Sequence, residues 1–125
     1  MATDQAVSKV SPAGRVEADV TPGMVREQAI AEEGFWAGLV RTAPGAASAW
    51  HHHGEHQTAI YVASGRLRME SGPGGREVIE AGEGDFLHVP AGAVHRESNP
   101  AEAESQLVVV RTGQGPTTIN VDGPT

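Results

Sequence analysis

The stretch GDFLHVPAGAVHRESN, residues 84–99, decides the fold of this chain. Residues 85–89 are predicted to form a short strand, because the segment is largely apolar and is bounded by turn residues. Pro90 ends this strand, since proline has no N–H to donate to a sheet. Gly92 permits a tight reversal, and His95 then comes back on the next strand. The segment therefore predicts two short strands, a tight turn between them, and a histidine on the second strand.

Short apolar runs of the same kind recur along the chain, separated by turns rich in glycine and proline. They lie at residues 34–41, 58–63, 66–70, 77–80, 106–111 and 117–121. Within one of them, Leu67 and Met69 alternate with charged residues, which is the two-residue period of a strand with one face in water. Residues 24–33 fit either a short helix or a strand with a turn. Together the runs predict an all-β fold, either a sandwich or a barrel.

The composition indicates one globular domain and argues against several classes of protein. The chain has 125 residues and a net charge of −7, which disfavours a nucleic-acid partner because such partners need a basic face. No stretch approaches the roughly 20 apolar residues of a membrane span. The first residues lack the apolar core of a signal peptide, so we expect a cytoplasmic protein. Because the chain has no cysteine, any transition metal must be held by nitrogen and oxygen ligands.

A second stretch, WHHHGEHQ at residues 50–57, contains four of the six histidines. It is internal, whereas affinity tags stand at chain ends and contain longer histidine runs. If the backbone is extended, His51 and His53 point to one face and His52 points to the other. Two imidazoles on one face can reach a single cation, and His95 can supply a third nitrogen. The spacing therefore predicts a metal site.

These two stretches resemble the cupins. The first cupin motif is G, five residues, H-x-H, three or four residues, E, six residues, G, and the second is G, five residues, P-x-G, two residues, H, three residues, N. The matching positions here are Gly45, His51, His53 and Gly65 for the first motif and Gly84, Pro90, Gly92, His95 and Asn99 for the second. The resemblance implies a small antiparallel jelly-roll β-barrel (a double-stranded β-helix) in which histidines of both motifs face one metal.

The chain departs from the first motif at the glutamate. After four intervening residues the position holds Thr58, and after three it holds Gln57. Some cupins carry another histidine instead, and strand alternation puts His56 on the same face as Thr58. We therefore expect the metal ligands to be His51, His53, His56 and His95, with Gln57 or a water molecule as the alternative fourth ligand.

The expected cofactor is one divalent transition metal, namely Fe, Mn, Ni or Zn. The resemblance suggests a metal-dependent enzyme that acts on a small oxygenated organic molecule, as a dioxygenase, an isomerase or a cyclase. The alternative is a binding or sensing protein of the same fold that takes a small ligand without turnover. Since one fold serves many reactions, the motifs do not select among them.

The chain is expected to divide into an arm at residues 1–33 and a barrel at residues 34–125. Residues 1–22 are polar and show no clear period. Small jelly-roll barrels have open sheet edges, and an arm of this length can cover the edge of a neighbouring copy. We therefore expect a homodimer to which the arm contributes.

Overall fold

The computed structural model describes residues 5–124 and consists of β-strands that pair antiparallel in two sheets. The strands are β1 (Val16–Thr21), β2 (Met24–Glu32), β3 (Phe35–Thr42), β4 (His51–His52), β5 (Gln57–Ser64), β6 (Arg66–Ser71), β7 (Glu77–Gly82), β8 (Phe86–Val89), β9 (His95–Ser98), β10 (Ser105–Thr112) and β11 (Ile119–Asn120). Two short 3₁₀ turns, η1 (Pro12–Gly14) and η2 (Pro73–Gly75), complete the elements. No helix in this described part is long and apolar enough to cross a membrane.

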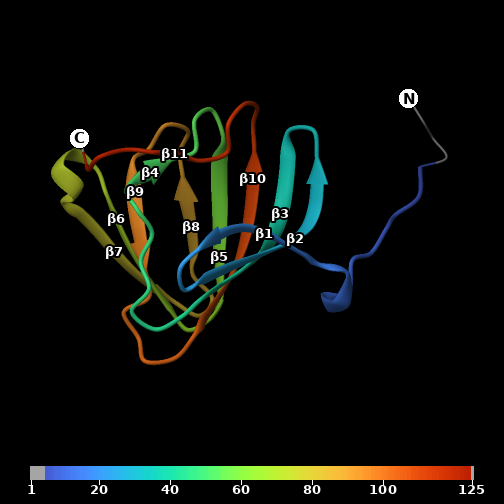
Figure 1. Ribbon diagram of the computed structural model, residues 1–125, viewed down its shortest axis with the longest axis horizontal. Helices are drawn as coiled ribbons and strands as arrows, with labels where there is room; N and C mark the ends of the chain where they lie inside the picture. The colour runs from blue at the N-terminus through green and yellow to red at the C-terminus, as the bar shows by residue number, and fades with distance from the viewer. Residues whose placement is uncertain (1–4, 125) are drawn as a thin grey trace.

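The two sheets face each other, as Figure 1 shows. The larger has the strand order β1-β2-β3-β10-β5-β8, and the smaller has the order β11-β4-β9-β6-β7. Strands that are distant in the sequence are therefore neighbours, since β10 lies between β3 and β5. This topology is that of an antiparallel jelly-roll barrel, so the predicted fold class is confirmed.

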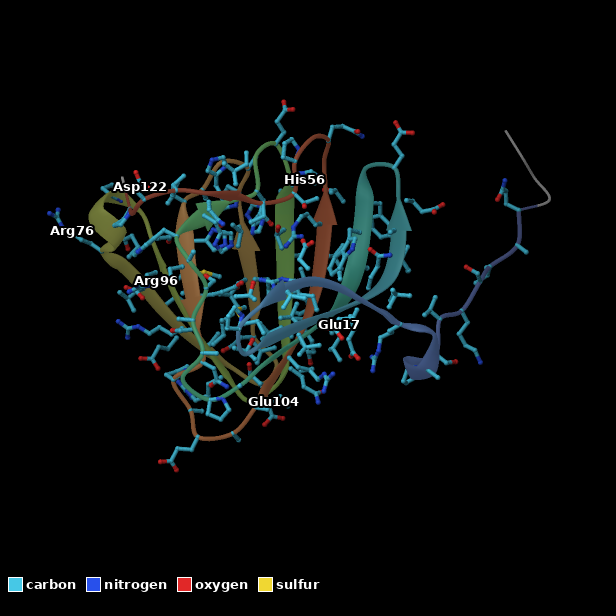
Figure 2. The ribbon with its side chains drawn as sticks, viewed as in Figure 1. Glu17, His56, Arg76, Arg96, Glu104 and Asp122 are labelled. Atoms are coloured by element: carbon cyan, nitrogen blue, oxygen red, sulfur yellow. The ribbon has the colours of Figure 1, made fainter. Side chains whose placement is uncertain are left out.

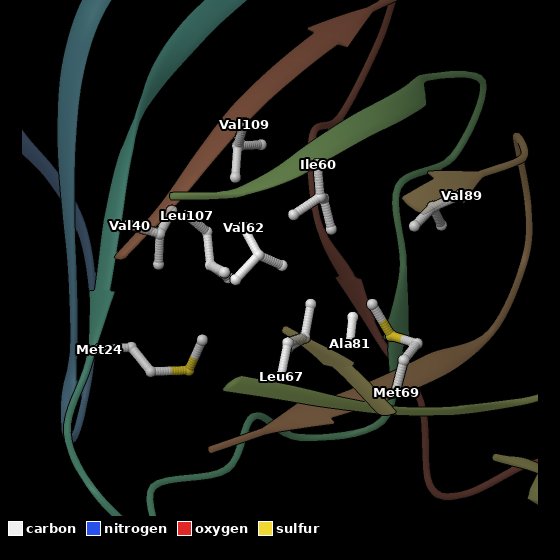
Figure 3. Close-up of a cluster of buried hydrophobic side chains, with 10 residues drawn as sticks. All are labelled: Met24, Val40, Ile60, Val62, Leu67, Met69, Ala81, Val89, Leu107 and Val109. Carbon is white, nitrogen blue, oxygen red and sulfur yellow. The ribbon is translucent and has the colours of Figure 1, made fainter. Parts of the chain in front are cut away.

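Alternation along the strands builds the core between the sheets. In β5, Ile60 and Val62 are buried while their neighbours along the strand are exposed. They face Leu67 and Met69 of β6 across the interior, with Leu107 of β10 beside them (Figure 3). Full burial of one such side chain contributes about 1.5–3 kcal/mol to folding. This cluster holds the two sheets together next to the site described below.

The predicted strands agree closely with the observed ones. Residues 24–33, for which the sequence left helix and strand open, contain β2, and β2 pairs with strands on both sides. Two of the predicted runs, residues 66–70 and 77–80, form a hairpin in which β6 pairs with β7 around η2. Pairing with the strands on both sides thus decides the structure of a segment whose own pattern is ambiguous.

The turn after Val89 places His95 as expected. Pro90 follows the last residue of β8, Gly92 has a φ of +74°, and the Ala93 N–H donates to the Pro90 carbonyl at 3.2 Å. Positive φ is strained for residues with a side chain, so glycine suits this position. The reversal carries the chain from the larger sheet into the smaller, where His95 begins β9.

Residues 5–15 run away from the two sheets (Figure 1). Residues 16–32 instead form β1 and β2, which lie at the edge of the larger sheet. The division of the chain at residue 33, and a role of the arm in dimerisation, stay predictions.

Candidate metal centre

Three histidines from two adjacent strands meet inside the barrel. His51 of β4 lies opposite His95 of β9 in the strand register, and His53 follows β4 by one residue. All three side chains are buried, and one nitrogen of each lies within 4.8 Å of the others. The side chain of His52 takes a different role, since its Nδ1 accepts a hydrogen bond from the Gly54 N–H at 3.0 Å. The alternation predicted for residues 51–53 is therefore observed.

Backbone carbonyls fix the tautomer of each of the three rings. The Nδ1 atoms of His51, His53 and His95 lie 2.8, 2.7 and 2.9 Å from the carbonyl oxygens of Ala49, Thr117 and Ala93. A carbonyl only accepts, so each Nδ1 carries the proton and donates it. The Nε2 atom of each neutral ring then keeps a free lone pair. Such second partners orient the histidine ligands of metal sites in the same way.

Electrostatics keeps two of these rings, those of His51 and His53, neutral. Burial, together with the positive charge of Arg111, lowers the pKa of His53 from 6.5 to about 3. Burial also lowers the pKa of His51, against the opposing effects of its hydrogen bond to the Ala49 carbonyl and of the Glu97 charge. A neutral imidazole is the form that binds a metal. His51 and His53 are therefore ready to coordinate at neutral pH without first losing protons.

The donor set fits a divalent transition metal. Three neutral imidazole nitrogens suit Fe, Mn, Ni or Zn, whereas Mg and Ca prefer oxygen ligands. Three protein ligands leave further coordination positions open, as in catalytic rather than structural zinc sites. The histidines line a cavity of about 270 Å³, which gives a ligand room beside such a metal.

His56 lies outside this group. Its side chain is buried, but its Nδ1 lies 3.1 Å from the His53 carbonyl and its ring lines a separate hollow with Gly113. Figure 2 shows it at the end of β5 next to β10. The His56 N–H also donates to the His53 carbonyl at 3.0 Å, which makes a turn of residues 53–56. Strand alternation does not extend through a turn, so the face of Thr58 does not fix that of His56.

Thr58, at the position of the family's glutamate, faces the cavity and is buried. Gln57 points the other way, where it is exposed and its Oε1 accepts a hydrogen bond from His88 Nε2 at 3.1 Å. In the structure, therefore, a neutral hydroxyl rather than a carboxylate or an amide stands at this place. The identity of the fourth metal ligand stays a prediction.

Two charged residues that the sequence reading did not select also line the cavity. Glu97 lies on β9 two residues after His95, and Arg111 lies on β10 two residues after the buried Val109. Alternate residues of a strand share a face, so parity alone was a usable signal for both. The signal was missed because charged residues in strands usually face water. Arg26, Asp19 and Trp36 are among the other residues of the wall that carry polar groups.

Comparison with known proteins agrees with this geometry. A family model described as "Cupin domain" matches residues 38–111. A search of curated proteins finds no match. Among solved structures, the polyketide cyclase RemF from Streptomyces resistomycificus is 19% identical with a TM-score of 0.78, over 93% of this chain and 86% of that one.

Two further structures are similar. KdgF from Halomonas sp. is 23% identical with a TM-score of 0.74, over 88% of this chain and 96% of that one. A sugar phosphate isomerase from Silicibacter pomeroyi, described as a cupin, is 23% identical with a TM-score of 0.74, over 92% of this chain and 82% of that one. These likenesses establish the fold, whereas the family model covers more than half of the chain and includes all three clustered histidines. The protein belongs to the cupin family.

Proposed function

We infer that this cupin is a metal-dependent isomerase or cyclase that moves a proton on a small molecule containing a carbonyl group. The observation that carries the proposal is the combination in one cavity of three neutral histidines and the carboxylate of Glu97. Metal ligands alone would suit a dioxygenase equally well. A carboxylate facing the same space adds a group that can accept and return a proton, and this favours proton transfer.

His51, His53 and His95 would hold the metal through their Nε2 atoms. A divalent metal bound there would supply a Lewis acid that polarises a carbonyl oxygen. The rest of the cavity is suited to a small organic molecule, since Ile60 and Val109 provide apolar wall opposite the polar groups. Binding sites commonly combine such an apolar wall with a few polar groups that fix orientation.

Glu97 is the proposed base. Its backbone is held on both sides by Ser48, whose N–H donates to the Glu97 carbonyl at 2.8 Å and whose Oγ accepts from the Glu97 N–H at 3.1 Å. Among residues 5–124 its carboxylate forms no ion pair within 4.0 Å, so it is free to take a proton. With a hydroxyketone, the carboxylate would remove the proton from the hydroxyl-bearing carbon next to the carbonyl, and the C–H electron pair would form the C=C bond of an enediol. The proton would then return to the former carbonyl carbon, while the hydroxyl proton passes from one substrate oxygen to the other. The proton is conserved, and no oxidant is consumed.

The fold is compatible with this class of reaction. Two of the similar structures are named as an isomerase and a cyclase. Their low identity makes this support for the architecture and not for a shared substrate.

The test is hydrogen exchange in deuterated water. Metal-loaded protein is incubated with a panel of 1,3-dicarbonyl compounds and hydroxyketones, and deuterium incorporation is followed by NMR. We expect exchange of at least one compound that depends on the metal and falls at least a hundredfold in Glu97→Gln, in line with the usual contribution of general base catalysis, about 10²–10⁴-fold. Glu104→Gln, an exposed carboxylate outside the cavity, is the matched control and should keep full activity. Oxygen consumption without exchange would contradict the proposal and favour a dioxygenase.

A further inference from the structure

The cavity contains a guanidinium that the proton-transfer proposal does not use. Arg111 enters from β10 on the same face as Leu107 and Val109, and it lines the cavity together with the three histidines. Its Nε donates to Thr58 Oγ1 at 3.3 Å, and its guanidinium carbon lies 5.6 Å from the centre of the Trp36 ring. The side chain is therefore held in place beside Thr58, the residue at the position of the family's glutamate.

Among residues 5–124, no hydrogen-bond or ion-pair partner is found for the outer nitrogens of this guanidinium. Within residues 5–124, Arg111 makes no ion pair within 4.0 Å, and the bond to Thr58 uses only its Nε. Arginine has five N–H donors, so the two terminal nitrogens retain theirs for a ligand. Arg26, the other cation of the cavity, differs because its Nη1 already donates to Thr21 Oγ1 at 2.9 Å. Arg111 is thus the better anion-binding group.

The charge balance of the cavity points the same way. Without a metal, Arg26 and Arg111 are offset by Asp19 and Glu97. The three histidines are neutral, so a divalent metal would leave the lined space with an excess of two positive charges. In most cupins the motif glutamate would offset part of this charge, whereas here Thr58 cannot. An anionic ligand would offset part of this excess in a partly buried space, where unpaired charge is costly.

We propose that Arg111 binds the carboxylate of the substrate, which makes the substrate class small oxo or hydroxy carboxylic acids. The inference rests on the proposed function, because the carbonyl or hydroxyl oxygen of the same molecule is the group that reaches the metal. A planar guanidinium pairs with a planar carboxylate through two parallel hydrogen bonds. A cavity of about 270 Å³ is small for a ligand site, which agrees with an acid of few carbons.

The experiment measures ligand binding to metal-loaded protein by calorimetry. The probes are oxo acids of three to six carbons, each paired with its own methyl ester, which keeps the carbonyl and removes the charge. We expect at least one acid to bind tenfold or more tightly than its ester. In Arg111→Gln this preference should disappear, whereas Arg111→Lys should keep part of it through the retained charge. Arg66→Gln, on the exposed Arg66 that pairs with Glu80 at 3.5 Å, is the control and should keep all of it.

Metal content, measured by elemental analysis in every variant, separates the two proposals. A wild-type protein that takes up no metal defeats the proposed function. A protein that takes up metal but binds acids and esters equally defeats the role of Arg111 alone. Inorganic phosphate is a further probe, and tighter binding of phosphate than of every acid would overturn the carboxylate assignment. If Arg111→Gln does not fold, the wild-type comparison of acid with ester and the Arg111→Lys variant still decide.

Discussion

Acidification of the metal-free protein should reduce its stability through His53. Its pKa is about 3 in the folded chain, against 6.5 as the ordinary value. Between these two pH values the unfolded chain binds a proton that the folded chain does not. Above pH 6.5 His53 is neutral in both states and does not lower the free energy of unfolding. As the pH falls from 6.5 towards 3, protonation of His53 in the unfolded chain lowers the free energy of unfolding.

The expected slope is about 1.4 kcal/mol per pH unit for one such group. From pH 6.5 to pH 4.5 the free energy of unfolding should thus fall by about 2–3 kcal/mol because of His53, and burial of His51 adds to the fall in the same direction. Urea denaturation of chelator-treated protein across this range measures the slope, and His53→Gln should flatten it. Equal slopes in the wild type and the variant would refute the argument that His53 is buried in its neutral form.

Three further predictions concern the ligand set, the frame of the site and the assembly. If the metal has three protein ligands, metal titration should give similar metal affinities for His56→Ala and Gln57→Ala. If His56→Ala alone weakens the metal affinity at least tenfold, about 1.4 kcal/mol, the four-imidazole set is established instead. Asn99→Ala should lower the free energy of unfolding by about 2–4 kcal/mol, because the buried amide makes three hydrogen bonds, two of them to carbonyls. A decrease of less than about 1 kcal/mol, measured by thermal denaturation, would contradict this role of Asn99. Light scattering should show a homodimer that weakens when residues 1–15 are removed, and a monomer unaffected by the deletion would exclude that assembly.

The sequence was sufficient for the features that depend on neighbouring residues. Strand alternation and the turn at Pro90–Gly92 are local, so the strands and the position of His95 could be predicted. The cluster of His51, His53 and His95 could be predicted because the two motifs fix the spacing of these histidines and the face of the strand on which each lies. Asn99, a fixed position of the second motif, directly follows β9, and its side-chain amide donates to the Thr42 carbonyl at 3.0 Å.

The features that depend on three-dimensional context could not be predicted in the same way. Parity put His56 on the inner face, but a turn at residues 53–56 interrupts the extended backbone on which parity depends. The cavity wall combines β2, β3, β9 and β10, which no local pattern brings together. Parity could place Glu97 on the face of His95 and Arg111 on the face of Val109, but only the sheet order brings both into one cavity with the histidines.

The central claim is that His51, His53 and His95 hold one divalent metal. Its most direct test is elemental analysis of protein purified without added metal and again after reconstitution, with X-ray absorption to identify the ligands. We expect about one equivalent of metal per chain and nitrogen donors at about 2.0–2.1 Å if the metal is zinc. His51→Ala should lose the metal. His52→Ala should retain it, because the His52 ring takes no part in the cluster and its Nδ1 accepts a hydrogen bond from the Gly54 N–H. A metal content well below half an equivalent after reconstitution, or equal metal retention in His51→Ala and His52→Ala, would contradict a metal site made of these three histidines.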